Sequence, residues 1–244
     1  SFPTRRSSDL RVVNVAVTQG SPRGRQAPRL EELRAACEFL QFELVTTAPG
    51  GLEKINPATR DRDHGHWAGC MNVIVRLLAE HRPRAIFFPH ELDWNSTHVG
   101  VHFLVMDALR ALPADFTTWA VETEFWGQMP TPNLMVESAD DDVADLIAGT
   151  SFHVGEVQRN PYHLIQPAWM QDNVRRGGEL VGGQGKGPPD FLFATLYRLR
   201  RWAGGELIPA WTGGRNVAAN EKPPPRFPRP PAKKPPGAPP RPRP

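Results

Sequence analysis

The sequence predicts an α/β fold, a mostly parallel sheet with helices on both faces. Short runs rich in β-branched and aromatic residues alternate with longer segments whose apolar residues recur at helical spacing. Turns rich in glycine, proline and polar residues separate these segments. The chain has 244 residues, which is enough for one domain with a sizeable core and a tail.

The first half of the chain sets out this alternation. RVVNVAVT is typical of a buried strand and ends at the turn-rich QGSPRG. The next segment places Leu30, Leu33, Cys37 and Leu40 at helical spacing, with Pro28 near the first turn. Pro83 must end the following helix. The predicted order is strand 11–18, helix 28–41, strand 42–46, helix 65–83 and strand 84–89.

The second half continues with a helix at 96–112, for which Ser96 or Thr97 is the expected N-cap. The stretch SADD is then expected to open a long helix as a capping box. Glycines should stop the last helical segment. The predicted elements here are strands 117–126 and 133–138 and helices 139–159 and 161–183.

Both ends of the chain differ in composition from its middle. Residues 1–10, SFPTRRSSDL, look like a translated adapter joined to a gene rather than a native segment. Residues 11–219 form the predicted domain, and 220–244 a disordered, proline-rich basic tail. The tail carries a charge of +6 whereas the whole chain carries +3, so the domain is mildly acidic. That charge gives no argument for nucleic-acid binding.

Other bulk features favour a cytoplasmic protein. Cys37 and Cys70 both fall in predicted helices and suggest no disulfide framework. No run of 18 or more apolar residues is present, so no membrane span is expected, and the first residues lack the apolar core of a signal peptide. A homo-oligomer stays possible.

The stretch HELDWNSTHVGVH raises the first question of function. It lies where strand 84–89 ends and helix 96–112 begins, and ligands bind outside the carboxyl ends of strands in such sheets. His98 and His102 share one face of that helix, and a neutral imidazole is a good zinc ligand. Two histidines do not make a zinc site, because a catalytic zinc needs three protein ligands. Capping and surface histidines are the alternative.

A resemblance gives these residues a context. RPRAIFFPHELDWNSTHVGVHFLVMDAL resembles a signature block of the PIG-L / LmbE-like N-acetylglucosaminyl deacetylases, which have a Rossmann-like fold. VNVAVTQGS with RLEELRAACEFL is similar to the family's strand, turn and Arg-x-x-Glu helix. HVGEVQRNPYH and VRRGGELVGGQG are similar to its C-terminal helical segment. The likeness covers about residues 11 to 205, in the family's order.

The resemblance implies a role for three residues. His98 matches a histidine that binds zinc, and Arg29 an arginine near the acetyl group or its product. Asn95 stands where many members have a second histidine that polarises the scissile carbonyl. For Arg29 the alternative is an i,i+3 ion pair with Glu32. His102 is interpreted as a structural or supporting residue.

The family's hallmark, Ala-His-Pro-Asp-Asp-Glu at the end of the first strand, is absent from this sequence, and SFPTRRSSDL stands in its place. The expected fold is therefore truncated at the first strand, and Asp9 is not expected to be a ligand. The resemblance implies zinc-dependent N-deacetylation of an N-acetylglucosamine-type conjugate, releasing acetate and an amino sugar, with this chain an inactive fragment. A non-catalytic sugar-binding domain and a nucleotide-binding α/β domain are the alternatives.

Other stretches have simpler interpretations. DRDHGHW, residues 61–67, could bind a divalent metal, but we expect Asp63 to cap a helix. GGQGKG, residues 182–187, lacks the spacing of a phosphate-binding loop and is expected to be a flexible loop. Most tryptophans should lie in the core or at its rim, although Trp94 and Trp126 could face a sugar ring.

Overall fold

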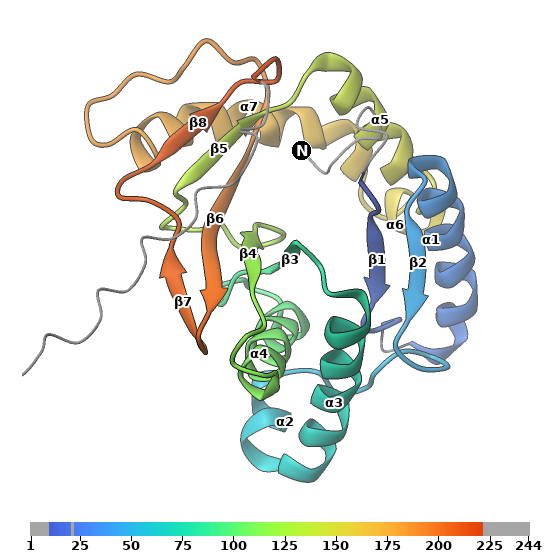
Figure 1. Ribbon diagram of the computed structural model, residues 1–244. Helices are drawn as coiled ribbons and strands as arrows, with labels where there is room; N and C mark the ends of the chain where they lie inside the picture. The colour runs from blue at the N-terminus through green and yellow to red at the C-terminus, as the bar shows by residue number, and fades with distance from the viewer. Residues whose placement is uncertain (1–9, 21, 222–244) are drawn as a thin grey trace, which may run out of the picture.

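The computed structural model describes residues 10–20 and 22–221, and within them it shows strands alternating with helices (Figure 1). The predictions for residues 1–9 and 222–244 lie outside this part of the chain. The first elements are β1 (Val13–Ala16), η1 (Arg23–Arg25), α1 (Gln26–Leu40), β2 (Glu43–Thr46), α2 (Pro57–Arg62), α3 (His64–His81), β3 (Ala85–Pro89) and α4 (Ser96–Ala111). The remaining elements are β4 (Thr118–Thr123), β5 (Leu134–Glu137), α5 (Asp140–Ser151), α6 (Val154–Val157), α7 (Tyr162–Leu180), β6 (Ala194–Ala203), β7 (Glu206–Pro209) and β8 (Arg215–Val217).

The α/β class is confirmed, and the strands form two sheets. β1 and β2 pair in parallel as one sheet, and the other six strands form the second. In the larger sheet the order is β3-β4-β6-β5-β8, with β3–β4 and β5–β8 parallel. The antiparallel ladders all involve β6, which pairs with β4, β5 and β7.

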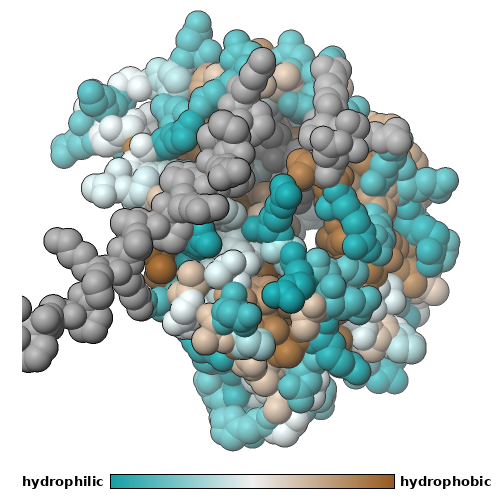
Figure 2. Space-filling model, in the orientation of Figure 1, coloured by the Kyte–Doolittle hydropathy of each residue, from teal (hydrophilic) through white to brown (hydrophobic). Residues whose placement is uncertain are grey.

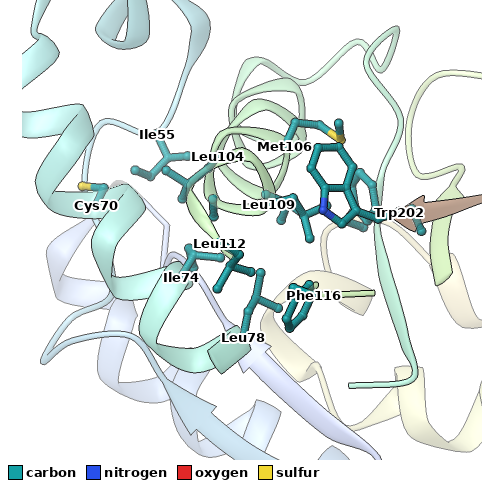
Figure 3. Packing of buried hydrophobic residues seen from close by; sticks show 14 of the residues in the cluster. Ile55, Cys70, Ile74, Leu78, Leu104, Met106, Leu109, Leu112, Phe116 and Trp202 are labelled. Carbon is teal, nitrogen blue, oxygen red and sulfur yellow. The ribbon is translucent and has the colours of Figure 1, made fainter. Parts of the chain in front are cut away.

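The main core lies between the α3–α4 pair and one face of the larger sheet (Figure 3). Leu104 and Ala108 of α4 are fully buried, and Trp202 of β6 packs into the same cluster. Gly100 permits this packing, because a Cβ there would lie 2.5 Å from the Ile55 carbonyl oxygen. A smaller cluster, with Met135 at its centre, forms where α7 covers β5 and β6. The main core thus packs helix α4 against the larger sheet.

The outer surface fits a folded domain with polar flanks. On the face seen in Figure 2, hydrophilic side chains dominate the outer rim, with apolar residues visible between them. No helix in the described part of the chain is long and apolar enough to span a membrane. Cys37 and Cys70 are both buried as free thiols in helices, and burial raises the pKa of each.

Three predicted helix boundaries were wrong. Asn95, rather than Ser96 or Thr97, caps α4. At the start of α5 the N-cap is Ala139, and only the reciprocal half of a capping box is formed by a hydrogen bond from its N–H to Asp142. The predicted helix 139–159 is divided into α5 and α6, because the chain leaves helical geometry at His153 (φ −81°, ψ 64°).

The last three strands were missed by the sequence prediction. β6 and β7 form a hairpin across Gly204 and Gly205, both of which have positive φ. The alternation of buried and more exposed positions in β6, followed by two glycines, is the signal that could have found it. This omission matters, because β6 brings Arg198 and Arg200 beside β4.

Candidate functional site

A cleft of about 450 Å³ lies among the loop after β1, helices α1 and α4, and the α5–α6 turn. Two of the residues singled out from the sequence, Arg29 and His98, line it together. Because they belong to α1 and α4, only the tertiary fold brings them to one cavity. The rest of its polar lining consists of Thr18, Gln19, Glu32, His153 and Glu156.

Arg29 is held in the cleft by an ion pair that joins distant parts of the chain. Its Nη2 donates to Oε1 of Glu156 at 2.8 Å, across 127 positions of sequence. Both side chains are 24% exposed, so the pair is accessible to a ligand from the cleft. Gly20 packs on the guanidinium, because a Cβ there would lie 2.2 Å from Nη1. The alternative expectation, a pair between Arg29 and Glu32, was wrong.

Two carboxylates and one imidazole give this end of the cleft its electrostatics. Burial raises the pKa of Glu156, but the Arg29 hydrogen bond and nearby arginines outweigh it, so its pKa is lowered and it is ionised. Burial lowers the pKa of His153 against the opposing field of Glu32 and Glu156, which keeps the imidazole neutral near pH 7. Oε1 of Glu32 accepts from the Gly155 N–H at 3.0 Å. Its Oε2 is buried with no hydrogen-bond partner among the described residues.

His98 enters the cleft from the first turn of α4, with a side chain 25% exposed. Its Nδ1 lies 3.1 Å from Oδ1 of Asp93, which orients the ring. The ring also packs against Phe125, with centroids 4.9 Å apart. Because Nδ1 is engaged, Nε2 is the nitrogen that His98 can offer to a ligand.

Asp93 organises this side of the site, a role that the sequence analysis missed. Its buried carboxylate accepts from the backbone N–H groups of Asn95 at 2.8 Å, Trp126 at 3.0 Å and Gly127 at 3.2 Å. Burial opposes its ionisation, but these hydrogen bonds outweigh burial and lower its pKa. One carboxylate therefore fixes the β3–α4 loop, the turn after β4 and the His98 ring.

Asn95 has a structural task at the same helix start. Its Oδ1 accepts from the N–H of Thr97 at 2.9 Å and of His98 at 3.4 Å. The residue is exposed and lies beside the cleft rather than among its lining residues. With Oδ1 engaged in the cap, only its Nδ2 amide could donate to a substrate carbonyl. Its role toward a carbonyl stays a prediction.

His102, one turn after His98, lies in the interior. It is 3% exposed, its Nδ1 is 3.0 Å from the Pro89 carbonyl oxygen, and Oε1 of Glu122 is 3.5 Å away. Burial, the largest effect, lowers its pKa although Glu122 opposes this, so the ring is neutral at pH 7. These contacts favour the structural interpretation of His102.

The cleft does not fit zinc with the residues that the structure describes. Among residues 10–20 and 22–221, no group of three or more His, Cys, Asp or Glu side chains is placed to hold a metal ion. His98 has Asp93 beside it, but the oxygens of Asp93 already accept from three backbone N–H groups. A three-ligand zinc site is therefore not formed by this part of the chain.

The other candidate stretches have structural roles. Asp63 caps α3 by accepting from the His66 N–H at 3.1 Å, as expected. His66 contacts the Glu53 carbonyl oxygen at 2.9 Å, and His64 contacts that of Arg60 at 3.1 Å. The GGQGKG stretch lies in turns that follow α7 rather than a strand.

Aromatic side chains extend outward from His98. Phe125 contacts its ring, Trp126 packs edge-on to Tyr162 at 5.6 Å, and Tyr162 lies 6.5 Å from Trp169. Trp126 and Trp169 are 46% and 48% exposed. We call Phe125, Trp126, Tyr162 and Trp169 the aromatic rim, which meets the cleft where Phe125 contacts His98.

Comparison with solved structures shows likeness at the level of the fold. The antimicrobial reagent A40926 pseudoaglycone deacetylase Dbv21 matches with a TM-score of 0.53 and 12% identity, over 81% of this chain and 87% of that one. The conserved protein TT1542 from Thermus thermophilus matches with a TM-score of 0.49 and 15% identity, over 79% and 83%. No protein-family model and no curated protein matches the chain. The chain thus shares the fold of a deacetylase.

Proposed function

We propose that the protein has the scaffold and part of the substrate cleft of a zinc-dependent hydrolase that removes the acetyl group from an N-acetylglucosamine-type conjugate. One observation carries the proposal: Arg29 and His98, which the resemblance pairs with the acetyl group and the metal, line the same cleft. The fold-level likeness to Dbv21 supports a deacetylase scaffold. The substrate would be a small molecule.

The described residues can bind and orient such a substrate. Arg29 offers a guanidinium to the acetamide oxygen or to departing acetate, while Glu156 keeps it extended into the cleft. His98 presents Nε2, with its ring held by Asp93. The aromatic rim supplies a wall for the sugar or its aglycone.

Zinc would supply the Lewis acid that activates water in such a hydrolase. Of the three ligands that a catalytic zinc needs, the described residues offer one, His98. The other ligands would have to come from outside residues 10–20 and 22–221. We therefore expect the 244-residue chain to hold less than stoichiometric zinc and to release no acetate.

A sugar-binding protein without catalysis is the second candidate, and the absence of a three-ligand metal group in the described ranges favours it. Both candidates predict binding of an N-acetylglucosamine conjugate in the cleft. They differ when a segment containing His-Pro-Asp-Asp is fused ahead of Arg11. A hydrolase scaffold should then take up zinc, whereas a binding protein should not.

The test measures ligand binding and zinc content separately. Titration calorimetry with an N-acetylglucosamine conjugate should show at least about tenfold weaker binding for Arg29→Gln, because a charged hydrogen bond is lost. Arg34→Gln is the matched control, since Arg34 lies on the same helix and is 58% exposed. In the fused protein, His98→Ala should abolish zinc uptake. Equal binding by both arginine variants, or zinc uptake that survives His98→Ala, would contradict the proposal.

A further inference from the structure

A second cavity, of about 170 Å³, lies on the α4 face of the larger sheet. Its charged lining comes from three arginines on separate elements, Arg60 of α2, Arg110 of α4 and Arg200 of β6, with Glu91 as the acidic member. It shares no lining residue with the cleft at His98. We call it the arginine pocket.

Arg60 and Arg110 both pair with the carboxylate of Asp107, which has no free acceptor position left. Arg60 donates to both oxygens of Asp107, at 2.7 and 3.0 Å, and Arg110 donates to Oδ1 at 2.9 Å. Oδ2 also accepts from the Trp67 indole at 3.0 Å. With five N–H donors each, Arg60 and Arg110 keep donors that Asp107 cannot take.

Arg200, the third arginine, likewise pairs with a carboxylate that it shares with another arginine. Arg200 donates through Nη2 to Oε2 of Glu122 at 2.5 Å, and Arg198 takes both Glu122 oxygens, at 2.6 and 2.7 Å. The Nε of Arg200 is buried and has no hydrogen-bond partner among the described residues. A buried donor left unpaired is costly, so this nitrogen marks a place where an acceptor is needed.

We propose that the arginine pocket binds a phosphoryl group, either as free phosphate or as the end of a phosphorylated ligand. Three guanidinium groups converge from different elements, which suits a tetrahedral ion with several acceptor oxygens better than a planar carboxylate. Both oxygens of Asp107 and of Glu122 already accept from arginines, whereas the arginine donors are in excess. Arg110 has the most exposed side chain of the three, at 56%, so an ion from solvent can reach it.

Glu91 lowers the net positive charge of the pocket. Its Oε1 accepts from Nη2 of Arg198 at 3.2 Å, and its side chain is 43% exposed. That exposure lets water screen its charge. With Arg198 included, four arginines face three carboxylates, Asp107, Glu122 and Glu91, so the network keeps a net charge of +1. An ordinary structural ion network that holds only water is the competing interpretation.

The experiment is calorimetric titration of the full chain with inorganic phosphate, methyl phosphate and acetate at constant ionic strength. We expect both phosphates to bind more tightly than acetate. Arg110→Gln should weaken phosphate binding at least about tenfold. The matched control is Arg175→Gln, because Arg175 has the same i,i+3 pair with an aspartate, at 2.8 Å to Asp172, away from any described pocket. The control should bind phosphate like the parent.

Several results would overturn the proposal: no phosphate binding beyond that of acetate, or equal losses in Arg110→Gln and Arg175→Gln. Arg200→Gln provides a second test, since Arg198 still pairs with Glu122 in that variant. It should weaken phosphate binding as well, and circular dichroism checks that it is folded. Binding of methyl phosphate as tightly as phosphate would point to a larger phosphorylated ligand, and preference for phosphate to the free ion. Because neither zinc nor deacetylation is measured, this test is independent of the proposed function.

Discussion

The two histidines of α4 are one helical turn apart, yet they lie in two different regions of the molecule. His98 stands at the edge of an open cleft, tied to a loop carboxylate, with a ring nitrogen available to a ligand. His102 is buried, with its ring next to Pro89 and Glu122, and it lines the arginine pocket rather than the cleft. Two histidines that share one helix face therefore lie in different surroundings, and Asp93 of the β3–α4 loop holds the ring of the one that lines the cleft.

The regions also differ in how they treat charge. Around His102, the buried carboxylate of Glu122 is paired with Arg198 and Arg200, and the Nε of Arg200 has no hydrogen-bond partner among the described residues. Around His98, a buried oxygen of Glu32 lacks a partner among the described residues, and Arg29 faces the cavity. Loss of the Glu122 carboxylate should therefore reduce stability, whereas changes at Arg29 or His98 should reduce ligand binding in the cleft.

The largest effect should come from Glu122→Gln, which leaves two partly buried guanidinium groups without their carboxylate. We expect a loss of about 3–5 kcal/mol in the free energy of unfolding, measured by urea denaturation. Glu91→Gln is the control, because Glu91 pairs with the same Arg198 but is 43% exposed. Its loss should stay below about 1 kcal/mol. Similar losses in both variants would show that the buried carboxylate contributes no more stability than the exposed one.

Lowering the pH should reduce the free energy of unfolding gradually, through the same carboxylates. Burial raises the pKa of Glu122 and Asp107, but their arginine partners outweigh it and hold both pKa values below the ordinary 4.5 and 3.8. Their stabilisation is present above those ordinary values and is lost as the pH falls through the lowered ones.

His102 adds an earlier loss. Burial lowers its pKa below 6.5, so the unfolded chain takes up a proton first and stability falls below about that pH. Burial likewise lowers the pKa of His153, which adds to the same step. Denaturation between about pH 8 and pH 3 should show both steps, and His102→Gln should reduce only the upper one. A profile that stays flat between about pH 6.5 and 5 would contradict the neutral, buried state of His102.

The smallest effects are expected when each of the two histidines is replaced by alanine. His102→Ala should cost about 2–3 kcal/mol, through lost packing against Phe88 and Phe103 and a lost hydrogen bond. His98→Ala should cost less than about 1 kcal/mol, since its ring is partly exposed. Thermal unfolding of both variants checks the order, and the reverse order would refute the comparison.

Local signals predicted most of the fold as far as α7. AIFF, its proline and the apolar stripe that follows indicated β3 and α4, and the structure has both. The β6–β7 hairpin was within reach of the same reasoning, since alternating residues precede two glycines. Strand direction around β6 was not, because antiparallel pairing with β4 joins segments 76 positions apart, as the Glu122–Arg198 bond shows.

The site was predictable only in part. His98 and Arg29 could be named from the resemblance, but their meeting in one cleft depends on tertiary packing. Arg29 pairs with Glu156, 127 positions away, rather than with Glu32, which lies one turn along the same helix. The burial of Asp93 could not be read from the sequence either, because two of the N–H groups that compensate it belong to Trp126 and Gly127.

The Asp93 carboxylate has a mechanical consequence. One oxygen contacts the His98 imidazole, and the other accepts from the backbone N–H of Trp126. The same carboxylate therefore holds both the His98 ring and one residue of the aromatic rim. We therefore expect that a ligand which displaces the Trp126 backbone also shifts the position of the His98 Nε2, even without contacting that ring.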